Sequence, residues 1–464
     1  MLSTELSVAP PGTPGPARRR RWIRVAWVVA GLAGLAGLAG LVAVAALPWE
    51  WSFIDDTGGR EILHEQQDRH GTAAGVWHAV EVWYRLDLTW GLFRPSWWLY
   101  AGVFYLLPVG PAHAARVLML ALAVAGPLLL AARAGRGPTR PVLIWCAAAL
   151  AANVSVYRGL WYVSLQELSG LCFVGLGLLA RRRQAPRIAA FLVAAWFKAP
   201  FAWLLVGYGT VLLLRRGTRW WGALCVALGA GTLVAAVRFA RTGSYTAGFG
   251  LDAGRVADAA QTAAVQFAPL GVVLVAGALA LRVRVPRWPW QGDPTGPALL
   301  LGGLGYLANL LPWQTGVHYA SPYLYLIGAG TVLTLAPGAR PAPRWWTAAG
   351  LAVAVAVGLV GLLAGARYVY RNAATTTGLR DCVLALPDGA VVGYNRPEAW
   401  DRLNAIIRYH RPDTRTRIAL IPNGVQDPGL DYYIWQRDYG PGTPALRGGP
   451  VICRTPLATV YRTR

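Results

Sequence analysis

The chain has 464 residues, of which 55% are hydrophobic and only 14% are charged, whereas a soluble domain usually carries about 25% charged residues. Apolar stretches long enough to cross a bilayer recur along it, which indicates a polytopic helical membrane protein. The net charge is +23, and arginines cluster in short loops such as "RRRQAPR" and "RVRVPR". An excess of positive charge in short loops sets the orientation of a protein in the membrane. Since a nucleic-acid site would also need a soluble basic face, no nucleic-acid partner is expected.

The N-terminal residues 1–21 are rich in proline and glycine and then basic, which predicts a disordered cytoplasmic segment. The apolar run 22–47 is too long for the hydrophobic region of a signal peptide, and no small-residue cleavage site follows it. We therefore expect a retained first helix that enters the membrane from the cytoplasm. The expected organisation is a transmembrane domain over residues 22–371, followed by a soluble domain over 372–464.

The later apolar segments predict ten more spans, at 113–132, 139–157, 160–180, 187–198, 200–214, 219–239, 263–283, 297–312, 318–336 and 345–366. Residues 96–108 are too few to cross and rich in aromatic side chains, so an interfacial or re-entrant element is expected there. This predicts an all-α multi-pass protein of the plasma membrane with about eleven spanning helices. Its N-terminus is cytoplasmic, and both the large loop 48–112 and the C-terminal domain are extracytoplasmic. One long tilted helix over 187–214 is the alternative, and it would reverse every later loop.

The C-terminal residues 372–464 differ in composition and predict a small extracytoplasmic α/β or α+β domain. "CVLALPDGAVVGYN" is typical of a strand, a turn and a second strand, and "PEAWDRLNAIIRYHRP" of a helix between two prolines. "RIALIP" and "GPVICRTPLATVYRT" predict further strands. Cys382 and Cys453 lie in expected strands of this exported domain, where disulfides can form, so they are predicted to pair. Two free buried thiols are the alternative.

Two adjacent carboxylates, Asp55 and Asp56, follow the first expected helix in the stretch "EWSFIDDTGGREIL". On the outer face they lie close to the bilayer surface, where a lipid-linked substrate presents its headgroup. Next to a low-dielectric region the pKa of a carboxyl group can rise toward the range of a useful general base. The alternative is that the two aspartates merely solvate the end of a helix.

Several cations are expected on the same outer face, although positive-inside sorting disfavours them there. Lys198 stands out, because a lysine near the membrane centre costs about 2.5–3.5 kcal/mol on the insertion scale. It could snorkel to the interface, or it could bind phosphate. Outer cations together with a carboxylate suit a reaction whose leaving group is a lipid-linked phosphate. The cations expected on this face include Arg94, Arg158, Lys198 and His318, and the candidate groove residues are His64, Asp87 and Tyr319. The histidines of the first loop lack the i, i+4 spacing of a helical metal pair, so no metal site is predicted.

The chain resembles the GT-C superfamily of membrane glycosyltransferases, which use polyprenyl-phosphate sugars. "FIDDTGGREIL" resembles the acidic motif of the family's first loop, and "DLTWGLFRPSWWLY" resembles a further stretch of several bacterial branches. "AAWFKAPFAWL" and "GVHYASPYLYL" are similar to two more, with Ala199 in place of a glutamate and His318 in place of an arginine. The resemblance implies an inverting transferase with Asp55 or Asp56 as the base, and a glycan, lipid or protein as acceptor. It also implies a bound polyprenyl phosphate whose candidate ligands are Arg94, Arg158, Lys198 and His318. It leaves open whether a divalent metal assists, because branches differ on this point.

Two other classes compete with the enzyme. A transporter or flippase of a lipid-linked sugar would need ionisable residues in the middle of several helices, and Glu167 and Arg238 are the nearest candidates. A non-catalytic assembly protein of the envelope would use its exported domain to recruit a partner, and Asp55 and Asp56 would then be replaceable. The concentration of charges on one face favours the enzyme.

Overall fold

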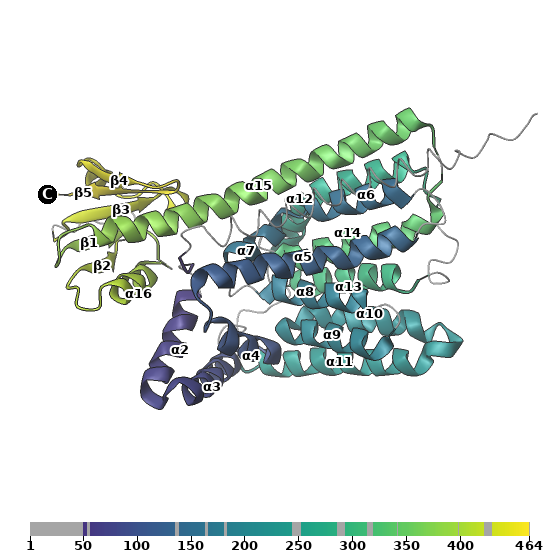
Figure 1. The fold of residues 1–464 in the computed structure, drawn as a ribbon, viewed down its shortest axis with the longest axis horizontal. Helices are drawn as coiled ribbons and strands as arrows, with labels where there is room; N and C mark the ends of the chain where they lie inside the picture. Colours follow the sequence, from purple (N-terminus) through teal and green to yellow (C-terminus); the bar gives the residue numbers. More distant parts are fainter. Residues whose placement is uncertain are drawn as a thin grey trace, which may run out of the picture. The chain divides into compact units, whose positions relative to one another are not determined.

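The computed structural model describes residues 50–52, 56–134, 139–162, 166–180, 183–243, 252–284, 293–312, 319–340, 342–397, 399–421 and 429–463. These residues all belong to one compact unit, Pro48–Arg464. The expected disordered segment 1–21 and the expected first helix 22–47 lie outside the described residues. The described chain is mostly helical and ends in a small sheet (Figure 1).

Within the expected first loop, the described residues that precede α5 form three helices, α2 (Asp56–His70), α3 (Thr72–Trp90) and α4 (Pro95–Phe104), which we call the first-loop helices. One face of α3 is buried at every fourth position, which is the period of a helix packed on one side: Gly75, Ala79, Trp83 and Asp87. Gly91 ends α3 with a φ of +80°, a left-handed conformation that favours glycine. α4 has ten residues, so the short element expected near 96–108 is too short to cross a bilayer.

Among the described residues, four helices are long and apolar enough to cross a membrane: α5 (Val109–Ala134), α11 (Arg219–Ala240), α12 (Ala253–Ala280) and α15 (Arg344–Leu384). A fifth span exists if α6 (Thr139–Ala151) is counted together with the short helices η1 (Val154–Tyr157) and α7 (Arg158–Trp161), which bend away from it by 61°. These apolar helices indicate a membrane protein, but the expected number of about eleven spans is not confirmed.

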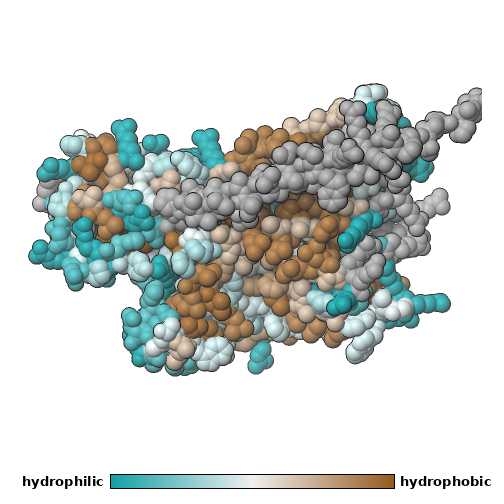
Figure 2. Space-filling view, viewed as in Figure 1, coloured by the Kyte–Doolittle hydropathy of each residue, from teal (hydrophilic) through white to brown (hydrophobic). Residues whose placement is uncertain are grey.

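Shorter helices fill the space between the long ones: α8 (Gln166–Leu179), α9 (Gln184–Phe197), α10 (Ala202–Leu213), α13 (Thr295–Leu310) and α14 (Ala320–Leu335). α14 is buried along nearly its whole length. The expected break within 187–214 is present, because α9 ends at Phe197 and α10 begins at Ala202. On the face shown in Figure 2, hydrophobic residues gather over the helical part of the molecule, whereas hydrophilic residues cover much of the sheet domain.

α15 is one continuous helix of 41 residues that crosses the expected boundary at 371/372 without a break. The strand expected at Cys382 is therefore wrong, since Cys382 lies in the last turn of α15. Leu379 and Val383 are both buried in the core of the sheet domain, and their spacing of four residues on α15 is typical of one face of a helix. The apolar run around Cys382 is too short to show the periodicity of a helix, which is why it predicted a strand.

The C-terminal sheet has five strands in the order β2-β1-β3-β5-β4. β1 is parallel to β2 and β3, whereas β5 is antiparallel to β3 and β4. The strands are β1 (Val391–Tyr394), β2 (Arg417–Leu420), β3 (Tyr432–Gln436), β4 (Val451–Arg454) and β5 (Ala458–Arg462). The expected helix is α16 (Trp400–His410), and the expected "RIALIP" strand is β2. The stretch "GPVICRTPLATVYRT" forms two strands, β4 and β5. Strand β3 was not predicted.

A disulfide joins Cys382 of α15 to Cys453 of β4, with 6.4 Å between their Cα atoms. It closes a loop of 71 residues, and in the chain-entropy model a loop of this length stabilises the fold by about 4 kcal/mol. We expect the Cys382→Ser/Cys453→Ser variant to unfold at a lower denaturant concentration in the sheet domain. Intact mass with thiol alkylation, before and after reduction, checks the bond itself. Alkylation of both cysteines without reduction would contradict it.

Candidate functional site

A cavity of about 2040 Å³ lies where the first-loop helices, the apolar helices and the sheet domain meet. Its wall takes residues from α2 and α3 on one side, from α8, α11 and α15 on another, and from the sheet domain on a third. Ligand pockets usually measure about 300–1,000 Å³, so this cavity has room for two substrates. It contains five of the residues predicted as ligands or groove residues: Asp87, Arg94, Arg158, Lys198 and Tyr319.

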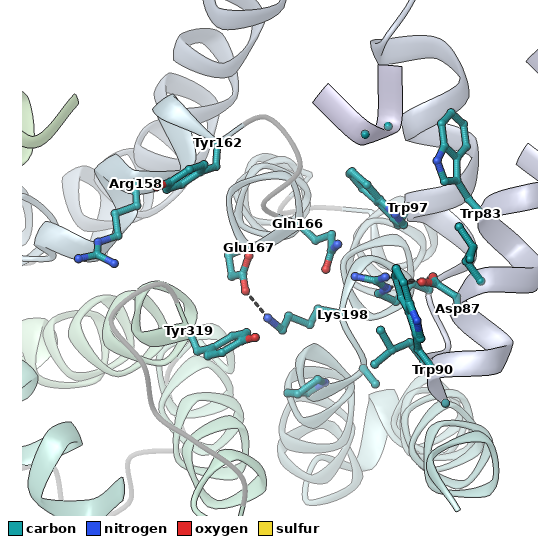
Figure 3. A pocket seen from close by; sticks show the side chains of 18 of the residues that line it. Trp83, Asp87, Trp90, Trp97, Arg158, Tyr162, Gln166, Glu167, Lys198 and Tyr319 are labelled. Carbon is teal, nitrogen blue, oxygen red and sulfur yellow. Dashed lines mark hydrogen bonds and ion pairs between the residues drawn. The ribbon is translucent and has the colours of Figure 1, made fainter. Parts of the chain in front are cut away.

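Lys198 lies at the break between α9 and α10, because Pro200 lacks the N–H that a continued α9 would need and its ring would clash with the carbonyl of Trp196. Its ammonium group forms an ion pair with Glu167 in the first turn of α8 and lies 4.0 Å from the ring centre of Tyr319 (Figure 3). The two charged side chains are 11% and 3% exposed. The candidate phosphate ligand is therefore held by a carboxylate and an aromatic ring.

Arg94 and Asp87 were predicted separately, as a phosphate ligand and a groove residue, and the structure joins them. Both Asp87 oxygens face the guanidinium of Arg94, with Nε donating to Oδ2 at 3.0 Å. The indole nitrogen of Trp98 donates to the same oxygen at 2.6 Å. Gly91 makes this possible by turning the chain sharply between α3 and α4. This arginine, like Lys198, is already neutralised by a buried carboxylate.

Arg158 has a different environment from these two cations. Its guanidinium carbon lies 4.7 Å from the ring centre of Tyr368 on α15, and it faces the cavity together with Arg367 and Arg371 of that helix. Within the part of the chain that the structure describes, none of these three arginines has a carboxylate within ion-pair distance. Like charges at i, i+4 destabilise a helix, so Arg367 and Arg371 weaken α15 unless an anion lies between them.

Arg116 of α5 holds the turn that carries Arg158. It is fully buried, and its guanidinium donates to the carbonyl oxygens of Gly159 at 2.8 Å and Tyr162 at 3.4 Å. It also donates to Ser169 Oγ at 2.8 Å. A four-residue helix such as α7 is not stable alone, so these bonds fix its position and direct Arg158 toward the cavity.

Asp56 is fully buried at the start of α2 and does not reach the cavity wall. Ser52 Oγ donates to its Oδ2 at 2.7 Å, and the hydroxyl of Tyr105 lies 3.4 Å from its Oδ1. Gly58 and Gly59 of the following turn do line the cavity. Asp55 lies outside the described residues.

Of the two candidate histidines, the structure describes His64, which does not line the cavity. His64 lies on the solvent side of α2, where Arg60 Nε donates to its Nε2 at 3.2 Å. Burial, and then the charge of Arg60, lower the pKa of this imidazole. His318 lies outside the described residues. Among the described residues, no group of three or more His, Cys, Asp or Glu side chains could hold a metal ion.

Sequence reasoning missed Arg367 and Arg371 as ligands and considered Glu167 only as a transport residue. A signal for the arginines was present: "GARYVYRN" places two of them four residues apart just after the last apolar run, on the side that is predicted to be extracytoplasmic and where cations are disfavoured. The pairing of Glu167 with Lys198 has no signal in the sequence, because only the fold brings together these two residues, which are 31 positions apart.

No protein-family model matches the chain, and comparison with curated proteins and with solved structures finds no match either.

Proposed function

We propose that the protein is an inverting glycosyltransferase that moves a sugar from a polyprenyl-phosphate donor to an acceptor hydroxyl on the extracytoplasmic side of the membrane. The observation that carries this proposal is the group of three arginines without carboxylate partners in the described chain, Arg158, Arg367 and Arg371, in a cavity that also has an apolar wall. We call these residues the arginine triad. They replace Lys198 and Arg94 as the main phosphate ligands in this proposal, since both of those are neutralised by carboxylates.

The apolar wall suits the lipid part of such a donor. One face of α11 lines the cavity with residues at helical spacing: Leu233, Ala236, Val237 and Ala240. A ligand with an apolar chain and an anionic headgroup would meet this wall and the arginine triad at once. A soluble nucleotide sugar would leave the apolar wall exposed to water.

The depth of the arginine triad also fits a lipid-linked phosphate. Trp345 and Trp346 are exposed at the start of α15, as expected of interface anchors. Arg367 follows Trp346 by 21 residues, or about 32 Å of helix. Because the hydrocarbon core of a bilayer is about 30 Å thick, a helix anchored there would bring Arg367 to the opposite surface.

In the proposed reaction, the acceptor hydroxyl gives its proton to a carboxylate as its oxygen attacks the anomeric carbon. The bond from that carbon to the phosphate oxygen breaks, and its electron pair leaves on the polyprenyl phosphate, where the arginine triad stabilises the developing charge. Attack from the face opposite the leaving group inverts the anomeric centre. We assign the base to Asp55, because the carboxylate of Asp56 is buried and hydrogen-bonded inside the protein.

Native mass spectrometry of the protein in mild detergent tests this function. We expect a co-purifying polyprenyl phosphate, or its sugar adduct, and longer retention of the adduct on an Asp55→Asn variant. Transfer from a synthetic polyprenyl-phosphate sugar should be lost in that variant while expression is unchanged. Bulk phospholipid as the sole bound lipid, together with unchanged activity of Asp55→Asn in cells, would overturn the proposal.

A further inference from the structure

The sheet domain contributes a carboxylate to the cavity, Asp438, which differs from the other acidic residues there. Five acidic residues line the cavity, and four of them are held in ion pairs by cations: Glu61, Glu65, Asp87 and Glu167. Asp438 forms no ion pair or hydrogen bond with any residue of the described chain. Its carboxylate is exposed to the cavity and available to a ligand.

The backbone that carries Asp438 is firmly held. It lies in η6 (Arg437–Tyr439), directly after β3. Gln436, the last residue of β3, is buried, and its Oε1 accepts a hydrogen bond from the Tyr394 hydroxyl at 2.5 Å. Its backbone nitrogen donates to Asn395 Oδ1 at 2.8 Å. This wall is therefore preorganised, which reduces the entropy lost when a ligand binds.

Tyr439 adds an aromatic ring to the same wall. The guanidinium carbon of Arg396 lies 4.7 Å from the ring centre, and Arg396 is itself buried. Gln436, Asp438 and Tyr439 all line the cavity. A carboxylate, an amide and a tyrosine on one fixed turn offer hydrogen-bond acceptors and donors side by side, which suits a ligand rich in hydroxyl groups.

The charges of the cavity narrow the ligand class further. Asp438 repels phosphate and other anions, which the arginine triad would bind instead. Amines are disfavoured in turn, since eight Arg and Lys residues line the cavity against five Asp and Glu. A neutral ligand with hydroxyl groups is repelled neither by Asp438 nor by the arginines. Hydrogen bonds from hydroxyl groups to an ionised carboxylate are also among the stronger hydrogen bonds in proteins.

We propose that Gln436, Asp438 and Tyr439 form an acceptor subsite for a neutral, hydroxyl-rich carbohydrate. This inference rests on the proposed function, because it names the substrate class that receives the sugar. Asp438 binds two hydroxyl groups of the acceptor and fixes its orientation, so the sheet domain determines which carbohydrate is extended.

Saturation-transfer difference NMR on the full chain in nanodiscs tests this subsite. The probes are four methyl glycosides in one mixture: glucoside, mannoside, galactoside and arabinofuranoside. We expect saturation of at least one glycoside by the wild type, and at least a fivefold weaker signal from both Asp438→Asn and Asp438→Ser. The matched control is Asp413→Asn, an exposed aspartate of the same domain that does not line the cavity, and it should behave as wild type.

Absence of saturation in the wild type, or equal signals from the wild type and the Asp438 variants, would overturn the subsite. Native mass spectra of the same samples separate this result from failure of the proposed function. Bound polyprenyl phosphate with no Asp438-dependent glycoside signal refutes the subsite alone. A glycoside signal that depends on Asp438, with no polyprenyl phosphate bound, refutes the donor assignment and leaves the subsite standing.

Discussion

Replacing Arg367 and Arg371 together with glutamine should lower sugar transfer by at least 100-fold. The two guanidiniums lie one turn apart on α15, line the cavity and have no carboxylate partner in the described chain. Removing one preorganised group that stabilises charge in a transition state costs about 10²–10³ in rate. Bound polyprenyl phosphate should fall in parallel, as native mass spectra would show. Removing the like-charge pair should also leave the unfolding transition unchanged or raise it.

The matched control for that double variant is Arg344→Gln. Arg344 is exposed and begins the same helix, about 35 Å from Arg367 along the axis. Its replacement removes a positive charge without touching the cavity, so transfer and lipid binding should stay at wild-type levels. Full transfer by the Arg367→Gln/Arg371→Gln variant would show that the arginine triad does not bind the leaving phosphate.

Replacing Lys198 with methionine should destabilise the protein strongly, because it leaves the carboxylate of Glu167 buried beside an apolar side chain. Breaking a buried ion pair by removing one partner costs about 3–5 kcal/mol. Glu167→Gln should cost a similar amount for the same reason. The double variant Lys198→Met/Glu167→Gln should recover most of the loss, since replacing both partners leaves no buried charge.

Equilibrium unfolding by SDS in mixed micelles measures this cycle, with Tyr319→Phe as a control that keeps the aromatic ring under the ammonium group. Additive losses in the double variant would contradict a direct ion pair. Transfer activity gives a second result: a stable but inactive double variant would mean that the pair also positions substrate.

Features that depend on neighbouring residues were predictable. Pro200 cannot continue α9, because it lacks a backbone N–H, so the break at Lys198 is visible in the amino-acid sequence. The prolines around α16 mark its ends in the same way. The disulfide between Cys382 and Cys453 was predictable, because both cysteines lie in the domain that is expected to be extracytoplasmic, where disulfides can form. The sequence did not indicate that Cys382 lies on a helix. These features depend on short-range sterics or on residue chemistry, which a sequence displays directly.

Features that depend on contacts between distant segments were not predictable. Glu167 and Lys198 are 31 residues apart, and Asp438 reaches the cavity only because the sheet domain lies over it. The long α15 was divided at 371/372 because composition changes there, but helical hydrogen bonding continues across the polar residues. Hydropathy reports where a helix leaves the apolar phase and carries no information on where the helix itself ends.

The continuity of α15 fixes the distance between the arginine triad and the core of the sheet domain. From Arg371 to Leu384 the helix continues for 13 residues, or about 20 Å, and its end is part of the core of the sheet domain. One continuous helix thus joins the arginine triad to the core of the sheet domain. In the proposed function, this helix sets the position of the acceptor subsite relative to the donor phosphate. Inserting a helical turn after Asn372 would move the sheet domain relative to the arginine triad and should lower sugar transfer.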